Sequence, residues 1–373
     1  MKLDWTKGTK SVAVARHHRI HCPAVSGGFV APEIKGQVEF DRYQLLLSIG
    51  RNLAMRTANR KLIKVLAAGR SPLLKHLVDN SDAPFQLSTE VLDLGDTALA
   101  GLSHDIGVGV SGLHMEAMDY VWRANGKEAL FPGGRFPDYV WDTGVASGGV
   151  VLSEAKGATS VKSDFDAVDA RARDGMFGQV MPRIGKTTLY GDDILAGYAF
   201  GVFAAGGQNA QSAAYETMDF TGGSPSAPGG MPSTSILRSH FAGVMRLLGL
   251  GDDWVDSHLF QGRVSFAMFG DDAQQFIVPE REPYGSMRSI RFDPATFPAL
   301  SLRVAARALN LRYGLGDDPV EGRVRWPRLP AQAENLPRGV LAVAPDGLAL
   351  VSHFGRRGPS LGWKPGGGFF PLG

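Results

Sequence analysis

The hydrophobic and polar positions of the chain alternate most clearly in its middle. Residues 136–141 (Phe-Pro-Asp-Tyr-Val-Trp) and 150–157 (Val-Val-Leu-Ser-Glu-Ala-Lys-Gly) are apolar runs with a few polar positions. The stretch between them, 142–149, is rich in Gly, Ser and Thr, so the pattern predicts two neighbouring β-strands joined by a turn. Because successive side chains of a strand point to opposite faces, we expect Glu154 and Lys156 to share one face.

Other periodic segments flank this pair of strands. Residues 97–122 predict a helix, a Gly-rich interruption and a second helix. An N-cap signal at 162–166 (Lys-Ser-Asp-Phe-Asp) begins another helix, which we expect to reach Val180. The continuous apolar run 195–205 is typical of a buried strand in a mixed sheet. The order of these elements predicts an α/β (α+β) core over residues 96–208, with a mixed sheet flanked by helices.

Three further regions complete the predicted organisation. Residues 1–95 predict a basic, mainly helical N-terminal region, since apolar residues recur at helical spacing over 38–68. Residues 209–235 are rich in Gly, Ser and Pro and predict a linker or loop. Residues 236–373 predict an α+β region, in which we expect a homo-oligomer contact or a contact with a partner protein. Its expected elements are a helix at 236–248, strands at 263–269 and 275–278, a helix at 300–313 and a hairpin at 339–353.

Composition places the chain among globular proteins. Its 373 residues, 44% hydrophobic and 20% charged, are enough for two or three domains with a sizeable core. The single cysteine, Cys22, excludes an intrachain disulfide. The N-terminus lacks the apolar segment of a signal peptide, and the longest apolar run, 194–207, is too short to cross a bilayer. We therefore expect a cytoplasmic protein without a membrane partner.

Charge is distributed unevenly along the chain. Residues 1–75 contain 14 Lys and Arg against 4 Asp and Glu, whereas the remaining residues contain 25 against 33. A basic surface attracts phosphate groups and releases their counterions, so we expect nucleic acid, DNA before RNA, as the partner. Ordinary solvated helix faces are the alternative explanation. The basic residues expected to contact nucleic acid are Arg51, Arg56, Arg60, Lys61, Lys64 and Lys162.

The candidate chemistry lies on the two central strands. With Asp138 on the strand beside Glu154, two carboxylates and the carbonyl of Ala155 offer the oxygen ligands that Mg²⁺ takes, and Mn²⁺ could substitute for it. Lys156 would orient an attacking water or stabilise the negative charge that builds on a phosphate under attack. The alternative is a solvated strand end that carries an ordinary ion pair.

The pair Pro137-Asp138, a hairpin-length gap and the triplet Glu154-Ala155-Lys156 resemble the signature of the PD-(D/E)XK nuclease superfamily. The resemblance is short and covers the middle third of the chain at most. It implies a restriction-endonuclease-like core, in which a helix, three strands, a helix and a strand follow one another.

The same resemblance implies roles for two more residues. Glu116, on the helix before the first strand, matches a position that faces the metal in some members of the superfamily. Gln179, on the helix after the triplet, matches a glutamine that assists the active site in the recombination-exonuclease branch. The implied activity is Mg²⁺-dependent hydrolysis of DNA, with RNA possible, by an endonuclease or exonuclease. Antiviral defence, interbacterial competition and DNA processing are settings that use such a core.

Other functions fit the sequence less well. Gly107 to Gly112 satisfies G-x-G-x-x-G, but it follows a helical pattern where a dinucleotide site needs a strand. Gly185-Lys186-Thr187-Thr188 lacks the glycine that a P-loop needs five positions earlier. His104-Asp105 is similar to a dipeptide of metal-dependent phosphohydrolases, without the other ligands of such a site. The main alternative to a nuclease is a non-catalytic nucleic-acid-binding or assembly protein that keeps the core.

Overall fold

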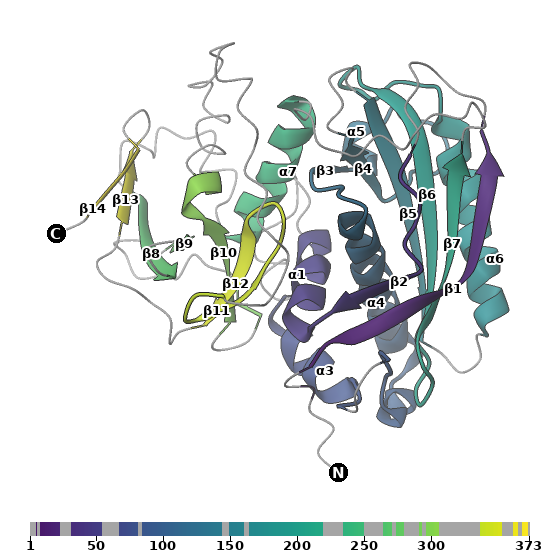
Figure 1. The fold of residues 1–373 in the computed structure, drawn as a ribbon, viewed down its shortest axis with the longest axis horizontal. Coiled ribbons are helices and arrows are strands. Elements are labelled where there is room, and N and C mark those ends of the chain that lie inside the picture. The colour runs from purple at the N-terminus through teal and green to yellow at the C-terminus, as the bar shows by residue number, and fades with distance from the viewer. Residues whose placement is uncertain are drawn as a thin grey trace. The chain divides into compact units, whose positions relative to one another are not determined.

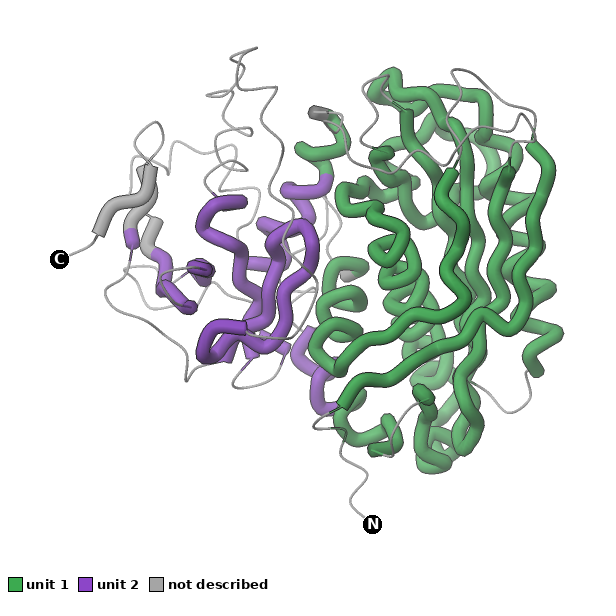
Figure 2. The backbone as a smooth tube through the Cα atoms, in the orientation of Figure 1, with its two compact units in different colours: residues 1–52, 73–239 green, residues 53–72, 240–373 purple. Residues whose placement is uncertain are grey.

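The chain divides into two compact units, residues 1–52 with 73–239 and residues 53–72 with 240–373 (Figure 2). The structure, a computed structural model, describes residues 5, 8–22, 31–53, 67–80, 84–143, 149–159, 164–218, 234–249, 264–270, 274–279, 291–292, 296–305, 336–352, 361–364 and 368–371.

The first unit is built on one curled mixed sheet with the strand order β2-β1-β7-β6-β5-β4-β3 (Figure 1). β1 is parallel to β7 and β5 is parallel to β6, while the other neighbours are antiparallel. The prediction of a mixed sheet flanked by helices is therefore confirmed. The strands are β1 (Lys10–His21), β2 (Gln37–Phe40), β3 (Arg123–Asn125), β4 (Tyr139–Asp142), β5 (Gly149–Ala158), β6 (Asp193–Phe203) and β7 (Gln211–Met218).

Helices cover both faces of this sheet (Figure 1). Gly157 of β5 lies against Ser103 of α4, whereas Gly201 of β6, which faces the opposite way, lies against Val168 of α6. The side chain of Asp164 caps α6 by accepting a 2.7 Å hydrogen bond from the N–H of Ala167, as the N-cap signal predicts. The described helices are α1 (Arg42–Leu53), α3 (Arg70–Leu77), η1 (Thr89–Asp93), α4 (Asp96–Ala117), α5 (Gly126–Ala129), α6 (Phe165–Gly175), η2 (Met176–Val180), η3 (Met181–Arg183) and α7 (Thr234–Leu247).

The glycine-rich segment that was expected to interrupt a helix instead lies inside the unbroken helix α4. A Cβ on Gly107 would come within 2.8 Å of the backbone nitrogen of Gly157. On Gly109 it would meet Ile49 of α1 at 2.7 Å, and on Gly112 it would meet Ser48 at 2.6 Å. The prediction was wrong because these glycines serve close packing rather than a turn, and the match to G-x-G-x-x-G is a packing pattern.

Alternation along β5 separates two environments. Val151 packs on the α4 side with Trp141, Tyr198 and Met115, all of which are buried in one cluster. Burial of side chains of this size contributes about 1.5–3 kcal/mol each to the free energy of folding. The opposite side of β5 carries Glu154 and Lys156, so these two charged residues lie away from the apolar cluster, whereas Ser153 faces it and accepts a 2.7 Å hydrogen bond from Trp141 Nε1.

The start of the chain differs in detail from the expectation. The helical pattern predicted a helix from Val38, but residues 37–40 form β2 and α1 begins at Arg42. β2 pairs with the beginning of β1, and this tertiary pairing overrides the local helical spacing.

The second unit contains an antiparallel sheet with the order β11-β12-β10-β9-β8-β13-β14. The predicted helix at 236–248, strands at 263–269 and 275–278, and hairpin at 339–353 are confirmed. Of the helix expected at 300–313, residues 302–305 are helical directly after β10, and residues 306–313 lie outside the described part of the chain. None of the described helices has both the length and the hydropathy to cross a bilayer. The strands are β8 (Val264–Gly270), β9 (Gln275–Pro279), β10 (Thr296–Ser301), β11 (Val340–Val343), β12 (Leu348–Ser352), β13 (Leu361–Lys364) and β14 (Gly368–Pro371).

The close approach of α4 to β5 can be tested with two glycines of the same helix. Gly107→Ala should lower the free energy of unfolding by about 1–3 kcal/mol, because the added methyl group meets backbone that cannot move aside. Gly101→Ala, at an exposed position with nothing within 4 Å of the new atom, should raise it by about 0.5–1 kcal/mol. Urea denaturation measures both. Equal stability of the two variants would contradict the packing described here.

Candidate active site

The two carboxylates predicted to converge lie opposite each other on adjacent strands. β4 pairs with β5 in a register that sets Tyr139 opposite Ser153. Asp138 directly precedes Tyr139, and Glu154 directly follows Ser153. The N–H of Asp138 donates to Oε2 of Glu154 at 3.0 Å, and the N–H of Ala155 donates to Oδ2 of Asp138 at 2.9 Å. Each carboxylate is thus held by the backbone of the other strand, and both lie at the end of the β4–β5 pairing.

Lys156 and Gln179 join this pair. Lys156 Nζ donates to Oε1 of Glu154 and lies 3.4 Å from Oε1 of Gln179. Gln179, on η2, also donates through Nε2 to the carbonyl of Phe136 at 2.6 Å. The glutamine therefore links the ammonium group to the segment that leads into Asp138. The structure brings together all four residues that the sequence singled out as catalytic.

Burial governs the charge of this group. Glu154 is only 1% exposed, and this burial, with the nearby charge of Asp138, raises its pKa to about 7 although Lys156 opposes the shift. Burial also raises the pKa of Asp138, against the hydrogen bond from Ala155 and the charge of Lys156. Two carboxylates share one ammonium, so full ionisation leaves an excess negative charge in a poorly solvated position.

The residues present fit a hard divalent cation. The two carboxylates and the adjacent carbonyl of Ala155 are oxygen donors, and a cation would offset the excess charge that raises both pKa values. Within the described part of the chain, no three His, Cys, Asp or Glu side chains gather as a metal-binding group. Asp138, Glu154 and the Ala155 carbonyl would thus leave positions for water, which Mg²⁺ usually retains.

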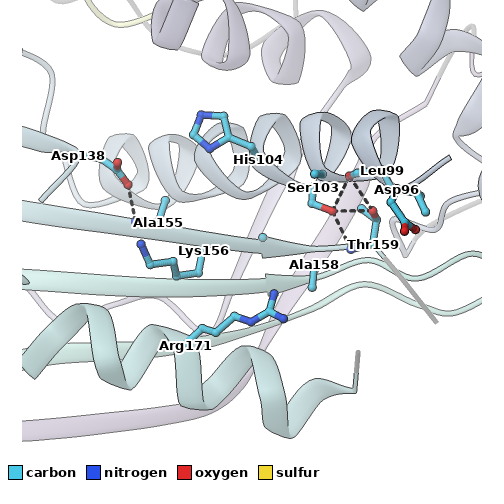
Figure 3. A pocket seen from close by; sticks show the side chains of 12 residues that line it. Asp96, Leu99, Ser103, His104, Asp138, Ala155, Lys156, Ala158, Thr159 and Arg171 are labelled. Atoms are coloured by element: carbon cyan, nitrogen blue, oxygen red, sulfur yellow. Dashed lines mark hydrogen bonds between the residues drawn. The ribbon is translucent and has the colours of Figure 1, made fainter. Parts of the chain in front are cut away.

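A cavity of about 570 Å³ opens beside the pair. Figure 3 shows Asp138 and Lys156 on the sheet, with His104 above them on α4 and Arg171 below them on α6. At its other end, Ser103 Oγ and Thr159 Oγ1 lie 2.6 Å apart. Glu154 lies beneath this surface, so Asp138 and Lys156 are the members of the group that line the opening.

Glu116, expected near the metal, occupies a different place. Its carboxylate pairs with Arg51 of α1, and the two side chains are 9% and 4% exposed. Glu116 lies twelve residues beyond His104 on α4, a distance of about 18 Å along the helix axis. The structure does not bring it to the carboxylate pair. Arg51, expected to contact nucleic acid, is buried in this ion pair and is not available to a phosphate backbone.

The other basic residues expected at a nucleic-acid surface are not part of the described chain. These are Arg56, Arg60, Lys61, Lys64 and Lys162. The segment Gly185-Lys186-Thr187 lies in the turn between η3 and β6, where the N–H of Gly185 donates to Ile194 O at 3.0 Å. Helical turns precede it, as expected, so it lacks the strand that a P-loop follows.

Sequence reasoning missed two cavity residues with chemistry. Arg171 was one of several basic residues on a predicted helix, and its spacing gave no reason to prefer it to its neighbour Arg173. His104 was noted only as part of a dipeptide. Both reach the cavity through the packing of α4 and α6 on opposite faces of β5, which no local pattern reports.

Comparison with protein-family models, with curated proteins and with solved structures finds no match to this chain. The interpretation of the site therefore stands on its geometry and chemistry.

The raised pKa of Glu154 has a consequence for stability. Between the ordinary value of 4.5 and about 7, the folded protein keeps a proton that the unfolded chain has released, so the free energy of unfolding falls as pH rises through this range. Glu154→Gln should remove this loss, on the order of 3 kcal/mol. We expect the difference in melting temperature, variant minus wild type, to be larger at about pH 8 than at about pH 5. For the exposed control Glu39→Gln, this difference from the wild type should be the same at both pH values. If the difference for Glu154→Gln also did not change with pH, the raised pKa of Glu154 would be contradicted.

Cation binding can be measured without any assay of activity. Mg²⁺ should raise the melting temperature of the wild type above pH 7, because a ligand that binds only the folded state stabilises it. Asp138→Asn should abolish this increase, while Asp174→Asn, at an exposed position on α6, should leave it intact. An equal response of all three proteins to Mg²⁺ would exclude the carboxylate pair as the binding site.

Proposed function

We propose that this chain is a metal-dependent nuclease that hydrolyses phosphodiester bonds of nucleic acid, with a core similar to that of the PD-(D/E)XK superfamily. The observation that carries the proposal is the convergence of Asp138, Glu154 and Lys156 beside a cavity that Asp138 and Lys156 line. The order α4, β3, β4, β5, α6, β6, with the short helix α5 after β3, supports it, since it follows the helix and strand order of that superfamily.

Each residue has a role that follows from its contacts. Asp138, Glu154 and the carbonyl of Ala155 would hold Mg²⁺ or Mn²⁺, which when bound supplies Lewis-acid stabilisation of phosphate charge and a more acidic water. Lys156, which donates to Glu154, places a positive charge beside the cavity, where it would stabilise the charge that develops on a phosphate under attack. In the overall reaction water adds to phosphorus, the bond to one ester oxygen breaks, and that oxygen leaves as a hydroxyl group.

Gln179 acts on this group indirectly. Its side chain joins Lys156 to the carbonyl of Phe136, two residues before Asp138. We assign it as a positioning residue that fixes the distance between the lysine and the first carboxylate. Its burial, 8% exposed, agrees with a residue that orients others.

The direct test is cleavage of end-labelled DNA and RNA by the purified chain in the presence of Mg²⁺ or Mn²⁺. Lys156→Ala and Glu154→Gln should each slow cleavage on the order of 10²–10³-fold, because each removes a charge placed for the transition state. Lys127→Ala, which removes an exposed lysine from α5, is the matched control and should cleave at the wild-type rate.

Two results would contradict the proposal. Cleavage that persists in both site variants would show a contaminating enzyme or a different site. Binding of nucleic acid without any metal-dependent turnover would instead favour the non-catalytic binding protein.

A further inference from the structure

Beyond Ser153, the strand that carries the site has an edge on which no described strand pairs, and we call it the open edge of β5. β4 pairs with β5 only over Val150 to Ser153, whereas β6 accompanies β5 as far as Ala158. Among the described strands, none continues the pairing beyond Ser153 on the β4 side. Side chains bind this edge instead: Asp138 accepts from the N–H of Ala155, and Ser103 Oγ accepts from the N–H of Thr159 at 3.1 Å.

The cavity follows this open edge and is walled by two helices. α4 forms one wall with Ser103 and His104, and Arg171 of α6 stands on the other side (Figure 3). Its volume of about 570 Å³ lies in the range of about 300–1,000 Å³ that holds a small organic ligand. It has room for about one or two nucleotides of one strand. A B-form duplex, whose major groove alone is about 12 Å wide, is larger than a cavity of this volume can enclose.

Two cationic groups lie one after the other along the edge. Figure 3 shows the ammonium group of Lys156 near Asp138 and the guanidinium group of Arg171 further along, beside Ala158. Arginine binds phosphate oxygens through a planar fork of N–H groups, and lysine binds them as a point charge. Successive phosphates of one strand would meet the two cations in turn, with the first phosphate at the carboxylate pair.

We propose that this cavity takes a single unpaired polynucleotide strand, laid along the open edge of β5, and that Arg171 binds the phosphate next to the one that is cleaved. The inference rests on the proposed nuclease function and deepens it by naming the substrate class: single-stranded or frayed nucleic acid, not intact duplex. A cavity of this volume holds about one or two nucleotides, so a strand whose backbone and bases both enter it must first leave its partner.

Binding is measured first, in EDTA, by fluorescence anisotropy of a labelled single-stranded DNA, the matching RNA and the blunt duplex. Arg171→Ala should weaken binding of the single strand about tenfold and reduce the slope of log K against log salt by about one. Arg173→Ala is the matched control, since it removes an exposed arginine of the same helix that does not line the cavity. Thermal unfolding of both variants checks that the fold is retained.

Cleavage is then compared in Mg²⁺ for the single strand, a duplex with a frayed end and the blunt duplex. We expect the first two to be cut about tenfold or more faster than the third, because the blunt duplex must open first. Equal cleavage of blunt duplex and single strand, or equal single-strand binding by the Arg171 and Arg173 variants, would overturn this inference and leave the nuclease proposal standing. Binding that depends on Arg171, with no cleavage of any substrate in Mg²⁺ or Mn²⁺, would overturn the nuclease proposal and retain the strand-binding cavity.

Discussion

Two carboxylates held together in a poorly solvated position, Glu154 buried and Asp138 half-buried, are the constraint on which this site depends. Asp138 and Glu154 approach because each accepts a hydrogen bond from the backbone of the facing segment, while Lys156 donates to Glu154 and its charge opposes the rise in the pKa of Asp138. Like charges in a poorly solvated position repel each other, and burial adds to the cost of ionising either one. The group can lower its free energy by keeping a proton or by binding a cation. Both responses follow from the backbone geometry of one hairpin.

Three glycines show how strongly the fold imposes this geometry. A Cβ on Gly126 would lie 1.9 Å from the carbonyl oxygen of Pro137, the residue before Asp138. On Gly157 it would lie 1.8 Å from the carbonyl oxygen of Ser103, and on Gly175 it would lie 2.8 Å from Cγ of Glu154. Segments from α5, α4 and α6 therefore press against the hairpin at positions where no side chain fits. The carboxylate pair is fixed from three directions, and such fixation is what a preorganised site needs.

Local pattern was enough to predict the parts of this site that depend on local geometry. The period of two in β5 places Glu154 and Lys156 on one face, and the antiparallel pairing of β4 with β5 brings Asp138 opposite Glu154. The positions that could not be predicted depend on contacts between distant segments. Whether Gly107 interrupts a helix or packs against β5 is decided by Gly157, fifty residues later. Likewise, Glu116 of α4 pairs with Arg51 of α1. The hydrophobic periodicity of the two helices does not predict which of their residues lie opposite each other.

Two of the acid–base groups described in the first unit differ in role: one joins helices, and the other lies at a cavity. Glu116 and Arg51 pair one acid with one base between α1 and α4, away from the residues that line the cavity, and the pair joins the two helices. Asp138, Glu154 and Lys156 combine two acids with one base, and two of the three residues line an opening that also holds Arg171. An additional, unpaired carboxylate does not stabilise the fold, because a buried charge without a partner has a high desolvation cost. An excess that faces an opening, beside cations suited to phosphate, is instead the arrangement that a cation and a polyanionic substrate can complete together.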